Sequence, residues 1–308
     1  MRGAAVDGMT CVRLRYRPPL DAAALGAFFQ QRRIEGVERV QRHEDGRGFT
    51  FTRTLALHAG GRRCTGWLCA QVEPSHCQVA LCFSAGLRPH EQLLVQRVRD
   101  WLDLDADPHA IHQVLAADFP HGKGLRVPGT LDGFELAVRA VLGQQITVAA
   151  ARTLAQRLAA RFGEPIATPH AGLDRLFPDA TRLVGADADA LGALGIVRQR
   201  QRALQALAHA VIEDGLRLEP AGDVAATMER LTALPGIGPW TAHYIALRAL
   251  RWSDAFPAAD VALQKALGVR DGPHPARAAE ARSEVWRPWR SYAVLRAWHG
   301  ASNTPEGT

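Results

Sequence analysis

Residues 231–260 read LTALPGIGPWTAHYIALRALRWSDAFPAAD, and this stretch decides the architecture that we expect. The run LPGIGP at 234–239 lies between two apolar stretches with helical spacing. Gly236 and Gly238 have no Cβ and can adopt positive φ angles, so their backbone can come within hydrogen-bond distance of a phosphate. The N–H groups that open the second helix would then point at that anion. The pattern predicts a helix-hairpin-helix that holds a DNA backbone without reading the bases.

A single carboxylate follows the hairpin. A Pro-containing loop spans residues 253–259, and Asp260 then precedes the apolar run 261–267. From local sequence alone, Asp260 is predicted to cap the helix that this run forms. Asp254 is the nearest other carboxylate, and we predict that it solvates the loop.

The order of these features, Leu-Pro-Gly-Ile-Gly, then a Pro-containing loop, then Asp, resembles the helix-hairpin-helix superfamily of DNA base-excision glycosylases. The sequences PGTLDGF at 128–134, VRAVLGQQITV at 138–148 and WRPWRSYA at 286–293 extend the resemblance to the bacterial 3-methyladenine DNA glycosylase II family (the AlkA type). The resemblance is most specific over residues 125–299 and looser over the first 90. It implies a DNA repair glycosylase that flips alkylated purines out of duplex DNA and excises them by hydrolysis. The implied partner is therefore double-stranded DNA that contains alkylated bases.

The resemblance implies that Asp260 is catalytic, a role that is compatible with helix capping. Breaking an N-glycosidic bond leaves positive charge on the deoxyribose, and a fixed carboxylate stabilises that charge or orients the attacking water. The lyase branch of the superfamily has a lysine where this chain has Trp240, so a monofunctional enzyme is implied. No motif places Lys123 or Lys265, the only lysines, to reach the sugar. Two alternatives stay open: a non-catalytic helix-hairpin-helix DNA-binding protein and a bifunctional glycosylase/lyase.

Four aromatic residues are expected to form the base pocket. Trp240 and Tyr244 lie four residues apart on one helix face, and Trp298 matches the tryptophan that faces the target base in the family. An alkylated purine is cationic, so electron-rich rings attract it by cation–π stacking of about 0.5–2 kcal/mol. Phe28 is expected to line the same pocket from the first domain. Each ring taken alone is better explained by core packing, and only the resemblance favours the pocket.

A second loop is expected to contact DNA. Gln145 matches the side chain that fills the gap left by the flipped nucleotide in the family, a role often taken by leucine. An exposed turn after Gly143 is the alternative. The hairpin carbonyls near Leu234 and Ile237 could hold a monovalent cation, whereas no side chain is expected to bind a metal. The full set of predicted DNA-binding residues is Gly236, Ile237, Gly238, Thr241, Gln144 and Gln145.

The composition is compatible with this function. The chain has 308 residues, of which 47% are hydrophobic and 22% charged, and its formal net charge is +6. This charge favours a polyanionic partner, although a basic housekeeping enzyme would show it too. The basic run Arg198, Arg200 and Arg202 is predicted to be a solvated helix face, with phosphate contact as the alternative.

The cysteines argue against a cofactor. They are Cys11, Cys64, Cys69, Cys77 and Cys82. Because their number is odd and no CxxC pairs occur, we expect buried thiols rather than a disulfide framework or a zinc site. Some glycosylases of the superfamily carry a four-cysteine iron–sulfur cluster after the catalytic domain, where this chain has no cysteine. The chain shows no secretory signal and no apolar stretch of membrane-spanning length, so we expect a cytoplasmic protein. We also expect a monomer that needs no cofactor.

The expected fold class is α+β. Period-two alternation predicts antiparallel strands at 11–16, 49–57, 66–72 and 78–83, and Asp21 is predicted to cap a helix over 22–32. From Pro89 onward the apolar spacing is helical, and the resemblance implies a two-lobed helical core. The tail, 302–308, is predicted to be disordered. The expected helices include 187–194, 202–213, 224–234, 241–252, 261–267 and 276–285. The expected domains are 1–88, then 89–127 together with 254–308, and 128–253 with the hairpin.

Overall fold

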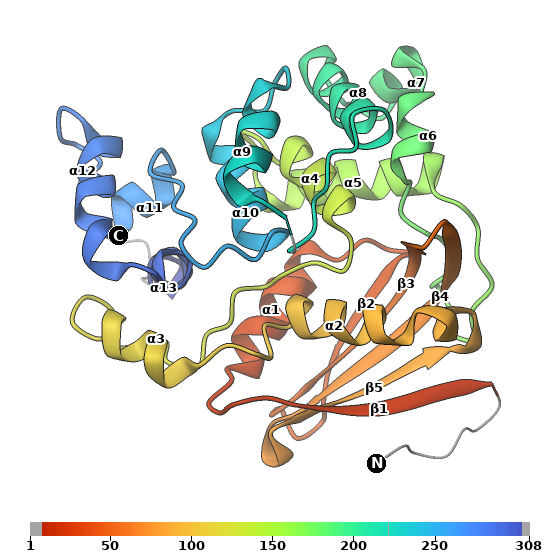
Figure 1. The fold of residues 1–308 in the computed structure, drawn as a ribbon, viewed down its shortest axis with the longest axis horizontal. Helices are drawn as coiled ribbons and strands as arrows, with labels where there is room; N and C mark the ends of the chain where they lie inside the picture. Colours follow the sequence, from red (N-terminus) through yellow and green to blue (C-terminus); the bar gives the residue numbers. More distant parts are fainter. Residues whose placement is uncertain (1–7, 221, 304–308) are drawn as a thin grey trace.

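The computed structural model describes residues 8–220 and 222–303, without the side chains of residues 301–303. An antiparallel sheet with flanking helices is followed by a helical part, so the predicted α+β class is confirmed (Figure 1). In that view the helices of residues 133–248 stand above the sheet, and those of residues 261–303 lie to its left.

The sheet has the strand order β1-β5-β4-β3-β2, and all neighbouring strands are antiparallel. Four of the strands overlap those predicted from alternation. The pattern misses β2, because this edge strand has only one apolar residue, Val40, among polar ones. The strands are β1 (Met9–Arg15), β2 (Glu38–Arg42), β3 (Phe49–Ala59), β4 (Arg62–Glu73) and β5 (Gln78–Ser84).

Two helices cover the apolar face of the sheet: α1 (Ala22–Arg32) and α2 (Glu91–Trp101). Asp21 caps α1 as predicted, because its carboxylate accepts a hydrogen bond from the N–H of Ala24 at 2.8 Å. α2 lies beyond residue 88, the expected end of the first domain, yet Leu94 and Val98 pack into the core of the sheet. The domain limits themselves stay a prediction.

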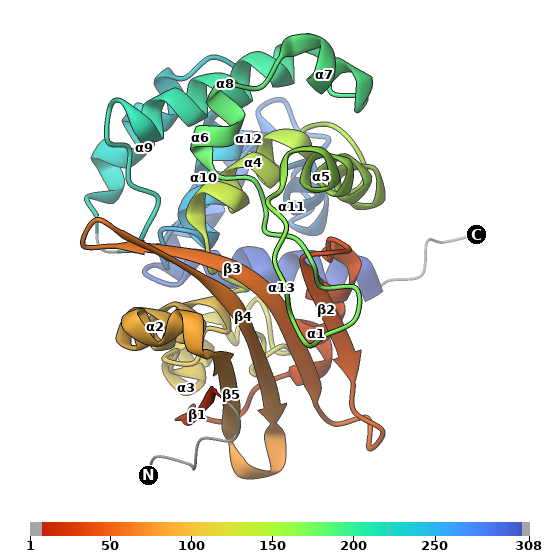
Figure 2. The same cartoon turned by 90° about the vertical axis from the view of Figure 1, so that its right-hand side faces the viewer.

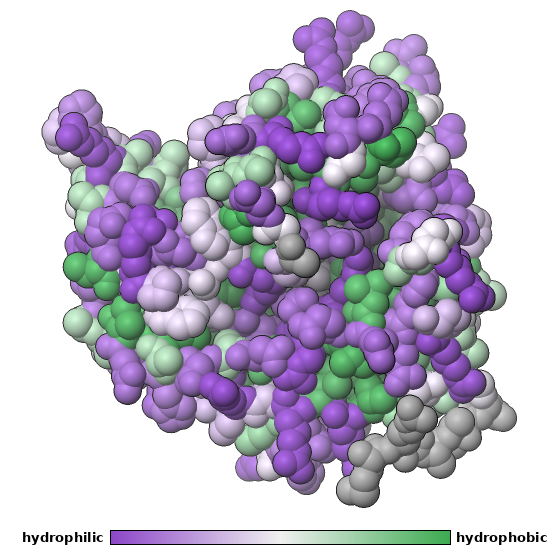
Figure 3. Space-filling model, in the orientation of Figure 1, coloured by the Kyte–Doolittle hydropathy of each residue, from purple (hydrophilic) through white to green (hydrophobic). Residues whose placement is uncertain are grey.

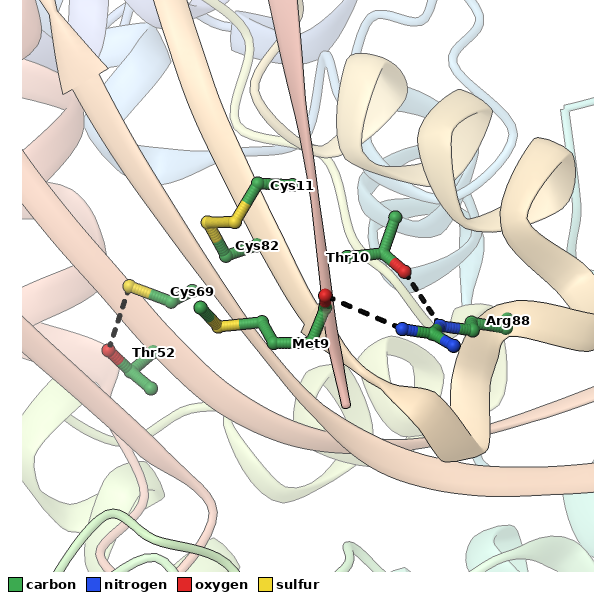
Figure 4. The surroundings of a disulfide bond; sticks show 7 residues. All are labelled: Met9, Thr10, Cys11, Thr52, Cys69, Cys82 and Arg88. Atoms are coloured by element: carbon green, nitrogen blue, oxygen red, sulfur yellow. Dashed lines mark hydrogen bonds between the residues drawn. A yellow bond between two sulfur atoms is a disulfide. The ribbon is translucent and has the colours of Figure 1, made fainter. Parts of the chain in front are cut away.

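The expectation that the cysteines are thiols is wrong for Cys11 and Cys82, which form a disulfide. The two residues are directly opposite each other on β1 and β5, with Cα atoms 4.1 Å apart. A sequence separation of 71 residues conceals this pairing. Cys69 on β4 lies on the other side of Cys82, and Thr52 donates a hydrogen bond to its sulfur (Figure 4). Burial raises the pKa of the Cys69 thiol.

The rest of the described chain is mainly helical. The predicted helices are found with ends that differ by four residues or fewer. The last helix extends to Asn303, so the predicted disorder is wrong for residues 302 and 303, while 304–308 lie outside the described residues. The helices are α3 (Pro108–Leu115), α4 (Gly133–Leu142), α5 (Val148–Phe162), α6 (Ala180–Val184), α7 (Ala188–Ala193), α8 (Arg198–Ile212), α9 (Val224–Ala233), α10 (Pro239–Arg248), α11 (Val261–Ala266), α12 (Pro275–Ser283) and α13 (Arg290–Asn303).

Two hydrophobic cores divide the helical part into two lobes. The first core is shared by the helices from α4 through α10 and includes Leu207. The second joins α3, α11, α12 and α13 and includes Leu263. α10 contributes Ile245 to the first core and Leu247 to the second. This helix therefore lies at the junction of the lobes.

A buried ionic network joins the sheet to the first lobe. Arg53 on β3 pairs with Glu38 on β2 at 2.9 Å and with Glu135 on α4 at 2.7 Å. Arg139, one turn after Glu135, pairs with Glu135 at 2.9 Å and with Glu38 at 2.8 Å. Burial raises the pKa of Glu38, but Arg139 and Arg53 lower it, and the net pKa is below the ordinary value. Removing one partner would leave a buried charge, so the network fixes the sheet against α4.

The loop between α5 and α6 makes a second attachment to the sheet, along which it runs in Figure 2. Gly36 forms a backbone bridge with Leu173. The Thr54 hydroxyl donates a hydrogen bond to the carbonyl of Arg175 at 2.5 Å. The first domain is thus held to the helical part by this loop as well as by the ionic network.

Hydrophilic side chains cover most of the face seen in Figure 3, with apolar groups in smaller patches between them. In residues 8–220 and 222–303, no helix has both the length and the apolar character needed to cross a membrane. Among the residues whose side chains the structure describes, the large apolar residues that are exposed are Val148, Val197, Ile212, Val261 and Val285.

Candidate active site

The predicted helix-hairpin-helix is present, with α9 ending at Ala233 and α10 beginning at Pro239. Gly236 has a φ of +80°, and a Cβ at this position would lie 2.9 Å from the Cβ of Ala203. The backbone of the hairpin therefore requires glycine here. Ile237 is only 2% exposed and anchors the hairpin in the core, and its N–H donates to the Leu234 carbonyl at 3.2 Å.

Of the two hairpin glycines that can adopt a positive φ, Gly238 does not. Gly238 has φ −88° and ψ 175°, an extended conformation that any residue can adopt, and it forms the N-cap of α10. Nothing lies within 4 Å of the position that its Cβ would take, and no side chain caps the helix. The start of α10 is thus open to an anion, as a phosphate-binding hairpin requires.

Asp260 caps α11 as predicted, and its Oδ1 accepts a hydrogen bond from the Leu263 N–H at 2.6 Å. Two indole N–H groups also reach the carboxylate. Trp240 Nε1 donates to Oδ2 at 2.7 Å, and Trp298 Nε1 donates to Oδ1 at 3.0 Å. These residues come from α10, α13 and the start of α11, so three helices converge on one carboxylate.

The predicted aromatic residues lie together beside this carboxylate. The rings of Trp240 and Tyr244 stack with centroids 5.4 Å apart and an interplanar angle of 13°. The ring of Trp298 lies 6.4 Å from that of Tyr244 and is tilted by 45°. All three side chains are half-buried rather than enclosed in a core. The structure therefore brings together Asp260, Trp240, Tyr244 and Trp298, which we call the aromatic cluster.

Phe28 reaches the edge of the aromatic cluster, but its ring faces arginines. The guanidinium carbon of Arg32 lies 3.8 Å from the Phe28 centroid, and that of Arg248 lies 4.8 Å from it. Arg248 also donates hydrogen bonds to the Tyr244 hydroxyl and the Pro128 carbonyl, both at 2.7 Å. Sequence analysis misses Arg248, although its position four residues after Tyr244 on α10 is a signal for contact.

The two arginines change the chemistry of the tyrosine. Burial raises the pKa of Tyr244, but the positive charges of Arg248 and Arg32 lower it, and the net pKa is below the ordinary value. Burial lowers the pKa of Arg32. Positive charge thus lies at the tyrosine hydroxyl, and the negative charge of Asp260 lies at the indole N–H groups.

The loop after α4 contacts the hairpin through Gln144. Its Nε2 donates to the Gly236 carbonyl at 2.8 Å and to the Thr241 hydroxyl at 3.0 Å, so this side chain is used within the protein. Thr241 is only 3% exposed. Arg200 donates to the backbone carbonyl of Gln144 at 2.5 Å. Gln145 is exposed and has a φ of +55°.

The arginines of the run at the start of α8 differ in their environment. Arg198 and Arg202 are exposed, as predicted for a solvated face. Arg200 is half-buried, and its hydrogen bond to the loop after α4 is a contact that the sequence pattern does not predict. One arginine of the run therefore supports the loop that carries Gln145.

The prediction that Asp254 solvates a loop is wrong. Asp254 is 9% exposed and pairs with Arg287 and, at 2.8 Å, with Nε of Arg290. Arg290 also donates to the backbone carbonyl of Asp254 at 2.8 Å. This pair fixes the start of α13, the helix that carries Trp298. The sequence conceals it because Arg290 lies 36 residues away.

A cavity of about 400 Å³ lies apart from the aromatic cluster, at α4 and α6, and its lining includes Arg97, Asp179 and Glu219. None of the predicted site residues lines it, so this cavity is separate from the predicted site. Residues 8–220 and 222–303 contain no group of three His, Cys, Asp or Glu side chains placed to hold a metal ion. The cation expected at the hairpin carbonyls stays a prediction.

Comparisons with known proteins identify the family of this chain. Residues 11–132 match the AlkA N-terminal domain family, and residues 138–291 match the HhH-GPD superfamily of base excision DNA repair proteins. The chain is 34% identical over 293 residues to DNA-3-methyladenine glycosylase 2 of Escherichia coli (strain K12), which covers 95% of this chain and 98% of that protein. The chain therefore belongs to the HhH-GPD superfamily of base excision DNA repair proteins, and within it to the family of this glycosylase.

Two further proteins extend the comparison. The chain is 36% identical over 302 residues to a probable bifunctional transcriptional activator/DNA repair enzyme AlkA of Mycobacterium tuberculosis, which covers 96% of this chain. The chain spans only 58% of the length of that relative. The solved structure of a 3-methyladenine DNA-glycosylase from Archaeoglobus fulgidus has the same fold, with a TM-score of 0.77, 20% identity and coverage of 95% of this chain and 99% of that one.

Proposed function

We propose that this protein is a monofunctional DNA glycosylase that flips an alkylated purine, of the 3-methyladenine type, out of duplex DNA and hydrolyses its N-glycosidic bond. The observation that carries the proposal is the carboxylate of Asp260 held among three aromatic rings, next to an anion-ready hairpin. The family membership and the relatives named above support the same reaction class.

The hairpin would hold the damaged strand. Gly238 leaves open space at the start of α10, where a phosphate could accept hydrogen bonds from backbone N–H groups. Gln145, exposed on the neighbouring loop, would fill the gap left by the flipped nucleotide. Unstacking a base costs a few kcal/mol and costs least for damaged pairs, which adds selectivity.

The aromatic cluster would bind the flipped base. The rings of Tyr244 and Trp298 are 6.4 Å apart and tilted by 45° to each other, so they offer two aromatic faces to a flipped base rather than a parallel slot of about 7 Å. A cationic purine would gain cation–π attraction from these rings. Its positive charge also makes it a good leaving group, so a general acid is not needed.

Asp260 would act on the sugar. As the glycosidic bond breaks, positive charge develops on the deoxyribose, and a fixed carboxylate stabilises it or orients the attacking water. The reaction consumes only water and one nucleotide, so we expect it to proceed without a cofactor and in the presence of EDTA. We expect the protein to act as a monomer.

The aromatic cluster favours hydrolysis over lyase chemistry. Lyases of the superfamily use an amine to attack the sugar, but Trp240 contributes an indole at that position, which cannot form a Schiff base. Lys265 is exposed in the last turn of α11, and Lys123 lies in the loop after α3. Neither belongs to the aromatic cluster.

The test is release of free base from methylated duplex DNA, combined with borohydride trapping on the same substrate. We expect free base, an intact abasic strand and no covalent adduct. A protein that binds DNA without releasing base would be the non-catalytic alternative. A trapped adduct that disappears in Lys265→Ala would establish the bifunctional alternative.

A further inference from the structure

The hydrogen bonds at Asp260 are distributed unequally between its two oxygens. Oδ1 accepts from the Leu263 N–H at 2.6 Å and from Trp298 Nε1 at 3.0 Å. Oδ2 accepts only from Trp240 Nε1, at 2.7 Å, among the described residues. A carboxylate oxygen offers about two lone-pair sites. Oδ1 is therefore saturated, whereas Oδ2 keeps one site open.

We propose that Trp240 and Trp298 are positioning residues whose indole N–H groups hold Asp260 so that Oδ2 is the oxygen that acts on the sugar. This inference rests on the proposed glycosylase function. The helix cap fixes Oδ1 through one bond only, and the carboxylate could still turn about its last side-chain torsion, which is soft. The two indoles contact both oxygens from different helices and so remove that freedom.

The arrangement also couples base binding to catalysis. Trp298 presents its ring to Tyr244, where the base would stack, and its Nε1 to Asp260. Trp240 likewise stacks on Tyr244 and donates to Asp260. The wall of the base site and the reacting oxygen are therefore held by the same two side chains. Such preorganisation lowers the barrier without reorganisation at the moment of reaction.

The inference separates the two functions of an indole, its face and its N–H. Replacing Trp240 or Trp298 by 3-benzothienylalanine keeps the size and the aromatic face of the side chain but exchanges the N–H for sulfur. We expect the single-turnover rate of base release to fall about 10–100-fold, as for the loss of a hydrogen bond to a charged group. The substrate concentration at half-saturation should stay within about twofold, because stacking and the phosphate contacts are kept.

A second readout reports the position of the charge directly. Wild-type protein should bind duplex DNA with a cationic pyrrolidine abasic-site mimic more tightly than DNA with a neutral tetrahydrofuran mimic. The substituted proteins should lose this preference by a factor similar to the loss in rate, while binding of the neutral mimic stays constant. Trp252, for which no indole hydrogen bond is found in the described part of the chain, is the matched control and should change neither value when substituted in the same way.

The indole ¹H–¹⁵N resonances test the hydrogen bonds independently of activity. Those of Trp240 and Trp298 should shift upfield in Asp260→Ala. If the wild type releases base and both substituted proteins release it at rates within threefold of the wild-type rate, this inference is overturned and the proposed function is left intact. Failure of the wild type to release any base would instead overturn the proposed function.

Discussion

Gln144 Nε2 donates a hydrogen bond to the carbonyl of Gly236 at 2.8 Å and thereby joins the loop after α4 to the hairpin. The same nitrogen donates to the Thr241 hydroxyl at 3.0 Å, and Arg200 holds the Gln144 carbonyl from α8. Gln145, the next residue, is exposed. The residue proposed to fill the gap in the DNA is thus carried on a loop whose distance from the backbone proposed to bind phosphate is fixed.

Adjacent glutamines should therefore have separable effects. Gln144→Ala removes two hydrogen bonds and should lower the free energy of unfolding by about 1–2 kcal/mol. Gln145→Ala should leave that free energy within about 0.5 kcal/mol but reduce excision from duplex DNA. Chemical denaturation and single-turnover excision measure the two effects. Equal losses of stability in the two variants would show that Gln144 is not the anchor.

The two hairpin glycines should also differ. Gly238→Ala places a methyl group in open space at an ordinary φ, so stability should change by less than about 0.5 kcal/mol. Gly236→Ala forces a φ of +80° and a contact with Ala203, and should cost more than about 1 kcal/mol. Gly238→Ala should nevertheless weaken binding to every DNA sequence alike, since a phosphate contact carries no sequence information. Unchanged DNA affinity in Gly238→Ala would contradict a phosphate at this position.

Asp254→Asn should destabilise the protein rather than act as a silent change. The substitution removes the charge that pairs with the buried Arg290 and with Arg287. We expect a loss of about 2–4 kcal/mol in the free energy of unfolding, within the range for broken buried pairs. Arg290→Lys should show a smaller loss, because lysine keeps the charge but cannot donate to both the carboxylate and the backbone carbonyl of Asp254 as the guanidinium does. A melting temperature unchanged by Asp254→Asn would mean that the pair does not hold α13.

His243 should make the fold sensitive to acid. Burial lowers the pKa of His243 below the ordinary value of about 6.5, and its ring accepts a hydrogen bond from the Phe256 N–H through Nδ1. The unfolded chain therefore binds a proton at higher pH than the folded chain, so the stability contributed by the neutral ring is present above about pH 6.5 and is lost as the pH falls through the folded pKa. Denaturation at pH 7.5 and pH 5 should show a smaller difference in His243→Gln than in the wild type. An equal difference would assign the acid sensitivity to other groups.

The features that local sequence encodes are those the structure reproduces. The hairpin, the cap of α11 by Asp260 and the stacking of Trp240 on Tyr244 all depend on residues within a few positions of one another. The strands with alternating apolar residues could also be predicted from the sequence. β2 could not, because it is a polar edge strand.

Contacts between residues far apart in the sequence could not be predicted from it. The disulfide joins residues 71 positions apart, and the bond from Gln144 to Gly236 spans 92. No period in the sequence encodes either separation. The failure at Asp254 has the same origin, because an acidic residue in a loop is predicted to be solvated unless its partner, here Arg290 on α13, is known. At position 238 the presence of glycine is explained by the open space around its Cα and not by its backbone φ, which any residue could adopt.

The most direct test of the central claim is single-turnover excision of alkylated base by Asp260→Asn. Asparagine is also a good helix N-cap, so the fold and the affinity for abasic DNA should stay close to those of the wild type. Loss of the fixed negative charge should slow excision by about 10²–10³-fold. The exposed Asp271→Asn, on the loop after α11, is the matched control and should be excision-competent. A rate for Asp260→Asn within threefold of the wild type would contradict the account.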